Sequence, residues 1–409
     1  MNKPELLAPA GNLEKLEVAL AYGADAVYFG GKMFGLRAFS DNFSEDELAA
    51  GIAMAHRAGR KAYVTVNVFA HNDDLAALPE FLSFIQASGA DAAIVADPGV
   101  LRLAREVAPA LPIHISTQAN TTNWSTALFW QGLGVRRVVL AREITLADIE
   151  LIRAKTTIEL EAFVHGAMCV SYSGRCLLSN YLTGRDANRG ECAQPCRWRY
   201  RLEEETRPGQ FMPVTEDARG TYIFNSKDLC LLARIPELAA SGLNSFKIEG
   251  RMKSVHYVAT VVKVYRQALD AWAADPGGYA VREDWLAELA KVSHRPYTTG
   301  FYFGRTGPDD QIYGQATYSQ SHEFVGLVRG YDPANGRALV EQRNNMKVGE
   351  EVEVLQPEGD NFRQVIAEMY DAEGQAITVA PHPQQLVAIP LGRPVAALAM
   401  LRRQVATDV

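Results

Sequence analysis

Short apolar segments alternate with amphipathic segments along roughly the first 270 residues of the chain. The apolar segments have the length and β-branched content of buried strands, and the segments between them have helical spacing. Expected strands cover residues 5–10, 26–30, 61–68, 92–96, 113–117, 137–140, 158–164 and 245–248. Expected helices cover residues 12–22, 44–58, 75–88, 98–107, 125–132, 145–154, 229–241 and 254–272. Asn12 and Ser44 are expected N-caps, with Glu47 placed for a capping box.

Eight strand–helix repeats predict an α/β fold, a (β/α)8 TIM-like barrel. The main alternative, an open doubly wound sheet, usually has fewer strands and often carries a glycine-rich nucleotide loop after the first one. Residues 8–12 read Ala-Pro-Ala-Gly-Asn, which is no such loop. The last two expected strands are separated by about 80 residues, far more than an ordinary βα loop. We therefore expect this long insertion, about residues 165–230, to carry function.

The pattern changes after residue 274, where Asp-Pro-Gly-Gly interrupts the helical spacing. Short strands between turns are expected at 324–329, 337–340, 351–355, 365–370 and 376–379, and residues 394–402 suit a strand or a short helix. We expect a barrel domain over residues 1–274, a linker or helical connection over 275–320, and a small C-terminal all-β barrel domain over 321–409.

Four of the five cysteines lie in the long insertion, at Cys169, Cys176, Cys192 and Cys196, with the spacing C-x6-C-x15-C-x3-C. Clustered thiolates hold soft metal centres, most often zinc or an iron–sulfur cluster. The two C-x2-C pairs of a zinc ribbon are missing, which favours iron–sulfur and leaves zinc as the alternative. Disulfides would need an oxidising compartment, and nothing in the sequence indicates one.

Composition places limits on the function. The chain is 48% hydrophobic and 22% charged, as in ordinary soluble proteins, and no apolar run suits a signal peptide or a membrane span. We expect a cytoplasmic protein that does not bind membranes. The net charge of −7 opposes RNA binding through global charge, so a local patch would be needed. Such a patch surrounds the cysteines, where Arg197, Trp198 and Arg199 could contact single-stranded RNA. A solvent-exposed alternating strand is the simpler alternative.

Polar side chains follow several expected strands, at the barrel end where active sites lie. They are Asn67 after the third strand, Gln118 and Asn120 after the fifth, Arg142 after the sixth, His165 after the seventh, and Glu249 and Arg251 after the eighth. Two arginines at one rim predict a pocket that binds a carboxylate by bidentate hydrogen bonds. Simpler roles compete: the asparagines could cap turns, Glu249 could pair with Lys247, and His165 could be a core residue, a supporting group or a catalytic acid.

Residues 161–179 read E-x-F-x-x-G-A-M-C-x4-G-x-C-x-x-S. This pattern resembles the signature of the collagenase-like peptidase family, also called the YegQ type. Residues 4–12, 26–30, 225–229 and 245–254 fit the same family. Residues 207–212 and 220–225 look most like its tRNA hydroxylation branch.

The resemblance implies a TIM-like barrel enzyme with a 4Fe-4S cluster. That branch uses prephenate to form 5-hydroxyuridine at the tRNA wobble position, so tRNA would be the partner and prephenate the co-substrate. The implied cluster ligands are Cys169, Cys176, Cys192 and Cys196. Cys230 departs from the pattern, although an exchange with Cys196 stays open, as does zinc after loss of the cluster. Oligomers, with itself or with a family paralogue, are also left open.

The resemblance also suggests roles in the pocket. Because prephenate is a dicarboxylate, Arg142, Lys247 and Arg251 would bind its charge. Asn67, Gln118 and Asn120 would orient it, and His165 and Glu249 would be catalytic.

A peptidase is the second hypothesis, because the family carries that name. The chain has neither H-E-x-x-H nor G-x-S-x-G. A thiol protease would need a low-pKa cysteine beside a histidine, and Cys169 with His165 is the available pair. A zinc-stabilised RNA-binding protein is the third hypothesis.

Overall fold

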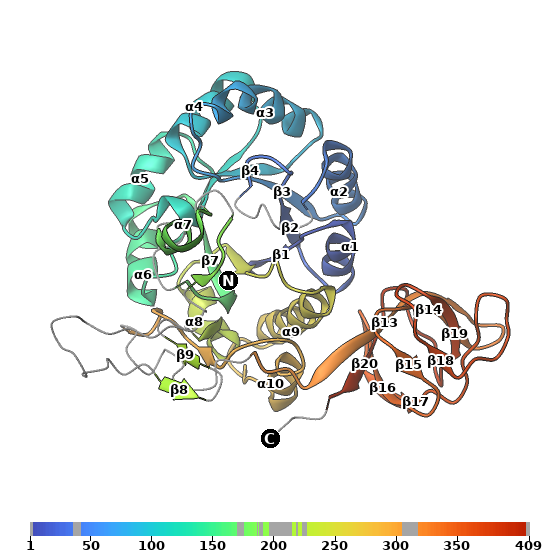
Figure 1. Ribbon diagram of the computed structural model, residues 1–409. Coiled ribbons are helices and arrows are strands. Elements are labelled where there is room, and N and C mark those ends of the chain that lie inside the picture. The colour runs from blue at the N-terminus through green and yellow to red at the C-terminus, as the bar shows by residue number, and fades with distance from the viewer. Residues whose placement is uncertain are drawn as a thin grey trace.

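The computed structural model describes residues 3–35, 42–169, 176–185, 187, 191–195, 215–217, 220–222, 227–304 and 318–405. Its main domain is a closed barrel of eight parallel strands, surrounded by helices (Figure 1). The barrel strands are β1 (Glu5–Pro9), β2 (Ala26–Phe29), β3 (Lys61–Val66), β4 (Ala92–Val95), β5 (Ile113–Ile115), β6 (Arg137–Val139), β7 (Glu159–Ala167) and β11 (Ser245–Ile248). Pairing of β11 with both β1 and β7 closes the ring. The predicted TIM-like fold is confirmed.

The helices around the barrel are α1 (Leu13–Ala21), α2 (Glu45–Arg57), α3 (Leu78–Ala87), α4 (Pro98–Val107), α5 (Trp124–Gly132), α6 (Leu146–Lys155), α8 (Ile235–Ala240) and α9 (Val255–Ala274). The first two begin at the predicted caps: the Asn12 side chain accepts a hydrogen bond from the backbone of Lys15 at 3.0 Å. Ser44 and Glu47 form the predicted reciprocal capping box. In the described part of the chain, no helix combines the length and the apolar character that a membrane crossing requires.

The segment in which the chain re-enters the barrel after the long insertion differs from the prediction. The helix expected over 229–241 begins only at Ile235, and the preceding residues form strand β10 (Asp228–Cys230) and a 3₁₀ turn (Leu232–Arg234). β10 runs antiparallel to the end of β7, with Cys230 opposite His165. Because β7 extends beyond the residues that close the barrel, its free backbone groups pair with β10, and this tertiary pairing overrides the local helical preference.

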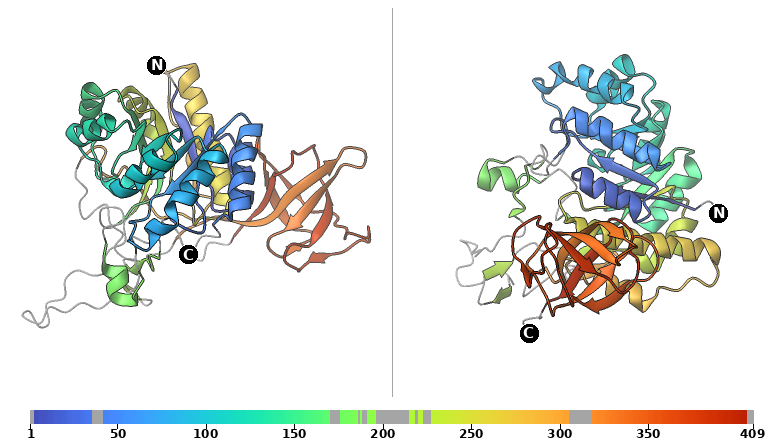
Figure 2. Two further views of the ribbon diagram at one scale, coloured as in Figure 1. Left: turned by 90° about the horizontal axis from the view of Figure 1, so that it is seen from above. Right: turned by 90° about the vertical axis from the view of Figure 1, so that its right-hand side faces the viewer.

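The cysteine-bearing insertion leaves the barrel from the end opposite the chain's N-terminus. It contains helix α7 (Leu178–Thr183) and the antiparallel pair β8 (Thr215–Asp217) and β9 (Gly220–Tyr222). Figure 2 shows α7 projecting beyond the carboxyl ends of the barrel strands. The predicted connection over 275–320 includes α10 (Glu283–Leu289) and β12 (Tyr297–Thr298), which pairs with β10.

The C-terminal domain is antiparallel throughout. Its main sheet has the order β17-β16-β20-β13-β14-β19, and β15 pairs with β18 beside it. The strands are β13 (His322–Asp332), β14 (Arg337–Gln342), β15 (Met346–Lys347), β16 (Glu351–Leu355), β17 (Phe362–Val365), β18 (Val379–Ala380), β19 (Leu386–Pro390) and β20 (Met400–Gln404). The all-β prediction is confirmed. The strands expected at 365–370 and 376–379 are displaced, and the open choice at 394–402 is a strand that starts at Met400.

Buried polar contacts attach this domain to the outer side of the barrel, near α9 (Figure 1). The Tyr22 hydroxyl of the barrel donates to the Leu398 carbonyl at 3.0 Å. The Lys263 ammonium on α9 donates to the carbonyls of Gln356 and Gly359 at 2.7 and 2.9 Å. Such contacts fix the position of the domain beside the barrel, away from the carboxyl ends of the strands.

Candidate active site

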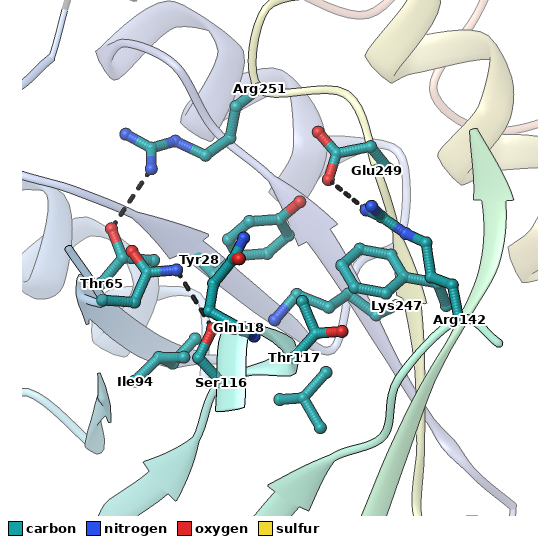
Figure 3. A pocket seen from close by; sticks show the side chains of 13 residues that line it. Tyr28, Thr65, Ile94, Ser116, Thr117, Gln118, Arg142, Lys247, Glu249 and Arg251 are labelled. Atoms are coloured by element: carbon teal, nitrogen blue, oxygen red, sulfur yellow. Dashed lines mark hydrogen bonds and ion pairs between the residues drawn. The ribbon is translucent and has the colours of Figure 1, made fainter. Parts of the chain in front are cut away.

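A pocket that opens to solvent lies inside the barrel at the carboxyl ends of its strands. Side chains from seven of the eight barrel strands or the turns that follow them surround it (Figure 3). The lining residues are Tyr28, Thr65, Asn67, Ile94, Ser116, Thr117, Gln118, Val139, Arg142, Phe163, Lys247, Glu249 and Arg251. The pocket thus contains six of the eight predicted substrate and catalytic residues; Asn120 and His165 do not line it.

Arg142 is held on one side of this pocket by two contacts. Its guanidinium pairs with the Glu249 carboxylate, with 3.0 Å between Nη2 and Oε2. The same guanidinium lies over the Phe163 ring, 4.0 Å from the ring centroid. Because Arg142 is only 7% exposed, these contacts fix a strongly directional cation at the edge of the cavity.

Arg251 is held on the opposite side by neutral oxygens. It donates to the Asn42 amide oxygen at 2.8 Å and to the Thr65 hydroxyl at 3.2 Å. The approach depends on Gly30, because a β-carbon there would lie 2.4 Å from the Thr65 hydroxyl oxygen and 3.0 Å from an Arg251 nitrogen. Gly30 therefore leaves the space that this arginine needs.

Lys247 forms part of the floor of the pocket. Its ammonium lies 2.8 Å from the carboxylate of the fully buried Glu161 and 4.2 Å from the centroid of the Tyr28 ring. The other carboxylate oxygen of Glu161 pairs with Arg137 at 3.0 Å, deeper in the barrel. Lys247 thus links the pocket to a buried ionic network below it.

The turn after β5 contributes a chain of short hydrogen bonds. The Asn67 amide donates to the Ser116 hydroxyl at 3.2 Å, and that hydroxyl accepts from the Gln118 backbone at 3.3 Å. Asn120 has a left-handed backbone, with φ 52° and ψ 48°, and its amide donates to the Gln118 carbonyl at 3.1 Å. Asn120 therefore positions the turn, whereas Gln118 reaches the cavity.

His165 lies apart from the pocket, in an aromatic cluster. Its ring centroid is 5.4 Å from those of Tyr265 and Tyr297 and 6.1 Å from that of Tyr257. The pairing register of β7 and β11 shifts next to this residue, which turns its side chain toward α9. Burial lowers the pKa of His165 to about 3, so the ring is neutral near pH 7.

The cysteine residues give a partial view of the predicted metal site. Cys169, Cys176, Cys192 and Cys230 are half-buried. Within the described ranges, no three histidine, cysteine, aspartate or glutamate side chains are grouped closely enough to hold a metal ion. The predicted ligand Cys196 lies outside those ranges. Burial raises the pKa of the Cys230 thiol. The described residues alone therefore do not provide a ligand set for the cluster.

The predicted RNA contact at Arg197, Trp198 and Arg199 lies outside the described residues. Earlier in the insertion, Arg185 donates to the Glu191 carbonyl at 3.1 Å. Tyr181 of α7 is 84% exposed, and Leu177, just before α7, is 73% exposed.

Several lining residues were not predicted from the sequence, among them Tyr28, Thr65 and Phe163. Each lies within a strand, whereas the prediction considered only polar residues at or after the carboxyl ends of the strands. The period-two alternation of strand side chains could have identified them, because inward positions lie in the same barrel interior as the rim residues.

Comparisons with known proteins agree with this architecture. The peptidase family U32 model matches residues 11–312, and the model of the U32 C-terminal domain matches residues 320–402. The chain belongs to peptidase family U32. The boundary between the two matches falls shortly before β13, where the antiparallel domain begins.

Three curated proteins are similar to this chain over much of its length. The tRNA hydroxylation protein P1 of Bacillus subtilis is 44% identical over 401 residues, which cover 98% of this chain and 95% of that protein. The tRNA hydroxylation protein P of Escherichia coli is 40% identical over 432 residues, covering 96% and 94%. The 23S rRNA 5-hydroxycytidine C2501 synthase of Escherichia coli is 37% identical over 332 residues, covering 80% of this chain and 48% of that protein.

Proposed function

We propose that this protein hydroxylates RNA, and specifically forms 5-hydroxyuridine at the wobble position of tRNA with prephenate as co-substrate. The observation that carries the proposal is similarity over nearly the whole chain to proteins named for tRNA hydroxylation, at 44% and 40% identity. The ribosomal RNA relative supports the broader class of reaction, hydroxylation of a pyrimidine in RNA. Since tRNA acts in translation in the cytoplasm, the proposed site of action is cytoplasmic.

The rim pocket supports the choice of a carboxylate co-substrate. Arg142 and Arg251 stand on opposite sides of the cavity, and Lys247 lies at its floor (Figure 3). A dicarboxylate could contact two of these cations at once, and each charge-assisted hydrogen bond would be stronger than a neutral one. Glu249 would hold Arg142 in its binding geometry, since the two already form an ion pair at 3.0 Å.

Glu249 is also the carboxylate best placed for acid–base work, because it lines the cavity. His165 is a weaker candidate, since its ring packs among three tyrosines outside the cavity and stays neutral. We therefore assign any proton transfer in the pocket to Glu249.

The proposal retains a 4Fe-4S cluster on Cys169, Cys176, Cys192 and Cys196. The support is their uneven spacing and their place in the insertion between β7 and β10. When bound, such a cluster would supply one-electron redox chemistry. Arg197, Trp198 and Arg199 would contact the RNA close to these cysteines. With a net charge of −7, that contact should be local, and its salt dependence modest.

The proposal is tested by nucleoside mass spectrometry of tRNA from a deletion strain that carries wild-type, Cys176→Ser or Cys230→Ser copies. Wild type and Cys230→Ser should restore 5-hydroxyuridine, whereas Cys176→Ser should not. Iron content measured after anaerobic purification should follow the same order. Normal levels of the modified base with Cys176→Ser would contradict the cluster assignment. Its absence with wild type, together with gelatin cleavage by metal-free protein, would favour the peptidase hypothesis.

A further inference from the structure

Gln118 presents a buried hydrogen-bond acceptor to the pocket. Its side chain is 8% exposed and lines the cavity. Its amide oxygen has no hydrogen-bond partner among the described residues of the protein. Figure 3 shows Gln118 among the side chains that surround the cavity. A buried acceptor without a partner is costly and uncommon in folded proteins, so its position in a binding pocket indicates a ligand group.

The backbone on both sides of Gln118 is fixed. The Ser116 hydroxyl accepts its backbone N–H at 3.3 Å, and the Asn120 amide donates to its carbonyl at 3.1 Å. Asn120 adopts the left-handed conformation, at φ 52°, which asparagine tolerates better than most residues other than glycine. The backbone that carries the Gln118 side chain is therefore held in place.

The surrounding charges restrict the partner of this oxygen. A carboxylate has no hydrogen to donate to an amide oxygen. A cationic amine could donate, but it would lie among Arg142, Lys247 and Arg251, which line the same cavity. A neutral hydroxyl both donates a hydrogen bond and avoids that repulsion.

We propose that Gln118 is a specificity-determining residue that accepts a hydrogen bond from a hydroxyl group of the small-molecule ligand. The pocket then selects a hydroxy-carboxylate over the same carboxylate without its hydroxyl. This inference rests on the proposed function, because prephenate, the proposed co-substrate, carries two carboxylates and one hydroxyl.

The test is calorimetric binding of prephenate and of its analogue in which hydrogen replaces the hydroxyl. Wild type should bind prephenate roughly tenfold more tightly, as expected for one buried hydrogen bond. Gln118→Met keeps a similar shape without the acceptor, and should bind both compounds about equally. Gln118→Glu keeps acceptor oxygens, so it should still prefer prephenate. It should bind both compounds more weakly, because its negative charge repels their carboxylates. Gln375→Met, at an exposed position in the C-terminal domain, should behave as wild type.

Equal binding of the two compounds by wild type would by itself overturn the inference that the pocket recognises the hydroxyl. A tenfold preference that persists in Gln118→Met would overturn it as well. Failure of wild type to bind prephenate at all would instead remove the proposed co-substrate, and this assignment with it. The two failures are thus distinguished by the wild-type titration alone.

Discussion

The two ends of the barrel interior both contain buried charges, but they use them differently. At the amino ends of the strands, Arg137 contacts the carboxylates of Glu5, Glu159 and Glu161 at 2.6, 2.8 and 3.0 Å. These groups fill the interior and satisfy one another. At the carboxyl ends, Arg142 and Arg251 instead border a cavity. The difference supports a structural role for the charges at the amino ends and agrees with the proposed ligand-binding role of the charges at the carboxyl ends.

One carboxylate joins the two ends. Glu161 is fully buried and contacts both Arg137 below and Lys247 at the pocket floor. Its removal would leave two buried cations without this shared partner. The two ends can therefore be tested separately. Substitutions at the amino ends of the strands should change stability, and substitutions at the carboxyl ends should change ligand binding.

The largest effect is expected for Glu161→Gln. Loss of the carboxylate should lower the free energy of unfolding by about 3–5 kcal/mol, because breaking a buried ion pair leaves uncompensated charge. Urea denaturation would measure the change. The control is Arg102→Ala, which removes an exposed pair with Glu106 on α4 and should change stability by less than about 0.5 kcal/mol. Similar midpoints for wild type and Glu161→Gln would contradict a structural role for the lower network.

A smaller effect, on binding, is expected at the upper end. Arg251→Ala should weaken prephenate binding by about 1.5–3 kcal/mol, through the loss of charge-assisted hydrogen bonds. Arg251→Lys should restore only part of the affinity, because an ammonium lacks the planar fork of the guanidinium. Calorimetry would measure both. Unchanged affinity in Arg251→Ala would remove this residue from the site.

The smallest effect concerns the pH dependence of stability, through Glu5 at the amino ends of the barrel strands. Burial tends to raise the pKa of Glu5, but Arg137, Tyr63 and Lys61 outweigh it and hold that pKa below its ordinary value of 4.5. The unfolded chain therefore binds more protons at Glu5 than the folded chain does between the two values. Its stabilising contribution is fully present above pH 4.5 and is lost as the pH falls through the folded pKa.

Glu5→Gln should accordingly flatten the dependence of stability on pH below about 4.5, relative to wild type. Denaturation midpoints measured from pH 6 to pH 3 (roughly the window in which carboxylates titrate) would show this. Parallel curves for the two proteins would mean that Glu5 keeps an ordinary pKa.

Sequence reasoning identified the fold and most of the pocket because both depend on local periodicity and on a general rule about barrel rims. It placed His165 at the rim because it could not detect the register shift between β7 and β11. It also assigned residues 229–234 to a helix, since their apolar spacing suits one. Both errors have the same physical origin: strand pairing between distant segments depends on tertiary contacts that no local pattern encodes.

The pairing of β7 with β10 has a consequence for how this family can diversify. The insertion leaves after Ala167 and returns at Asp228, and these two residues lie opposite each other in the antiparallel ladder. Because the ladder fixes both ends, doubling the length of the intervening chain would add only about 0.6 kcal/mol of closure entropy. The segment carrying the four cysteines can thus gain or lose residues over evolutionary time while Glu161 and Phe163 keep their register in the barrel. The length of the insertion can therefore change without disturbing the pairing of the barrel strands.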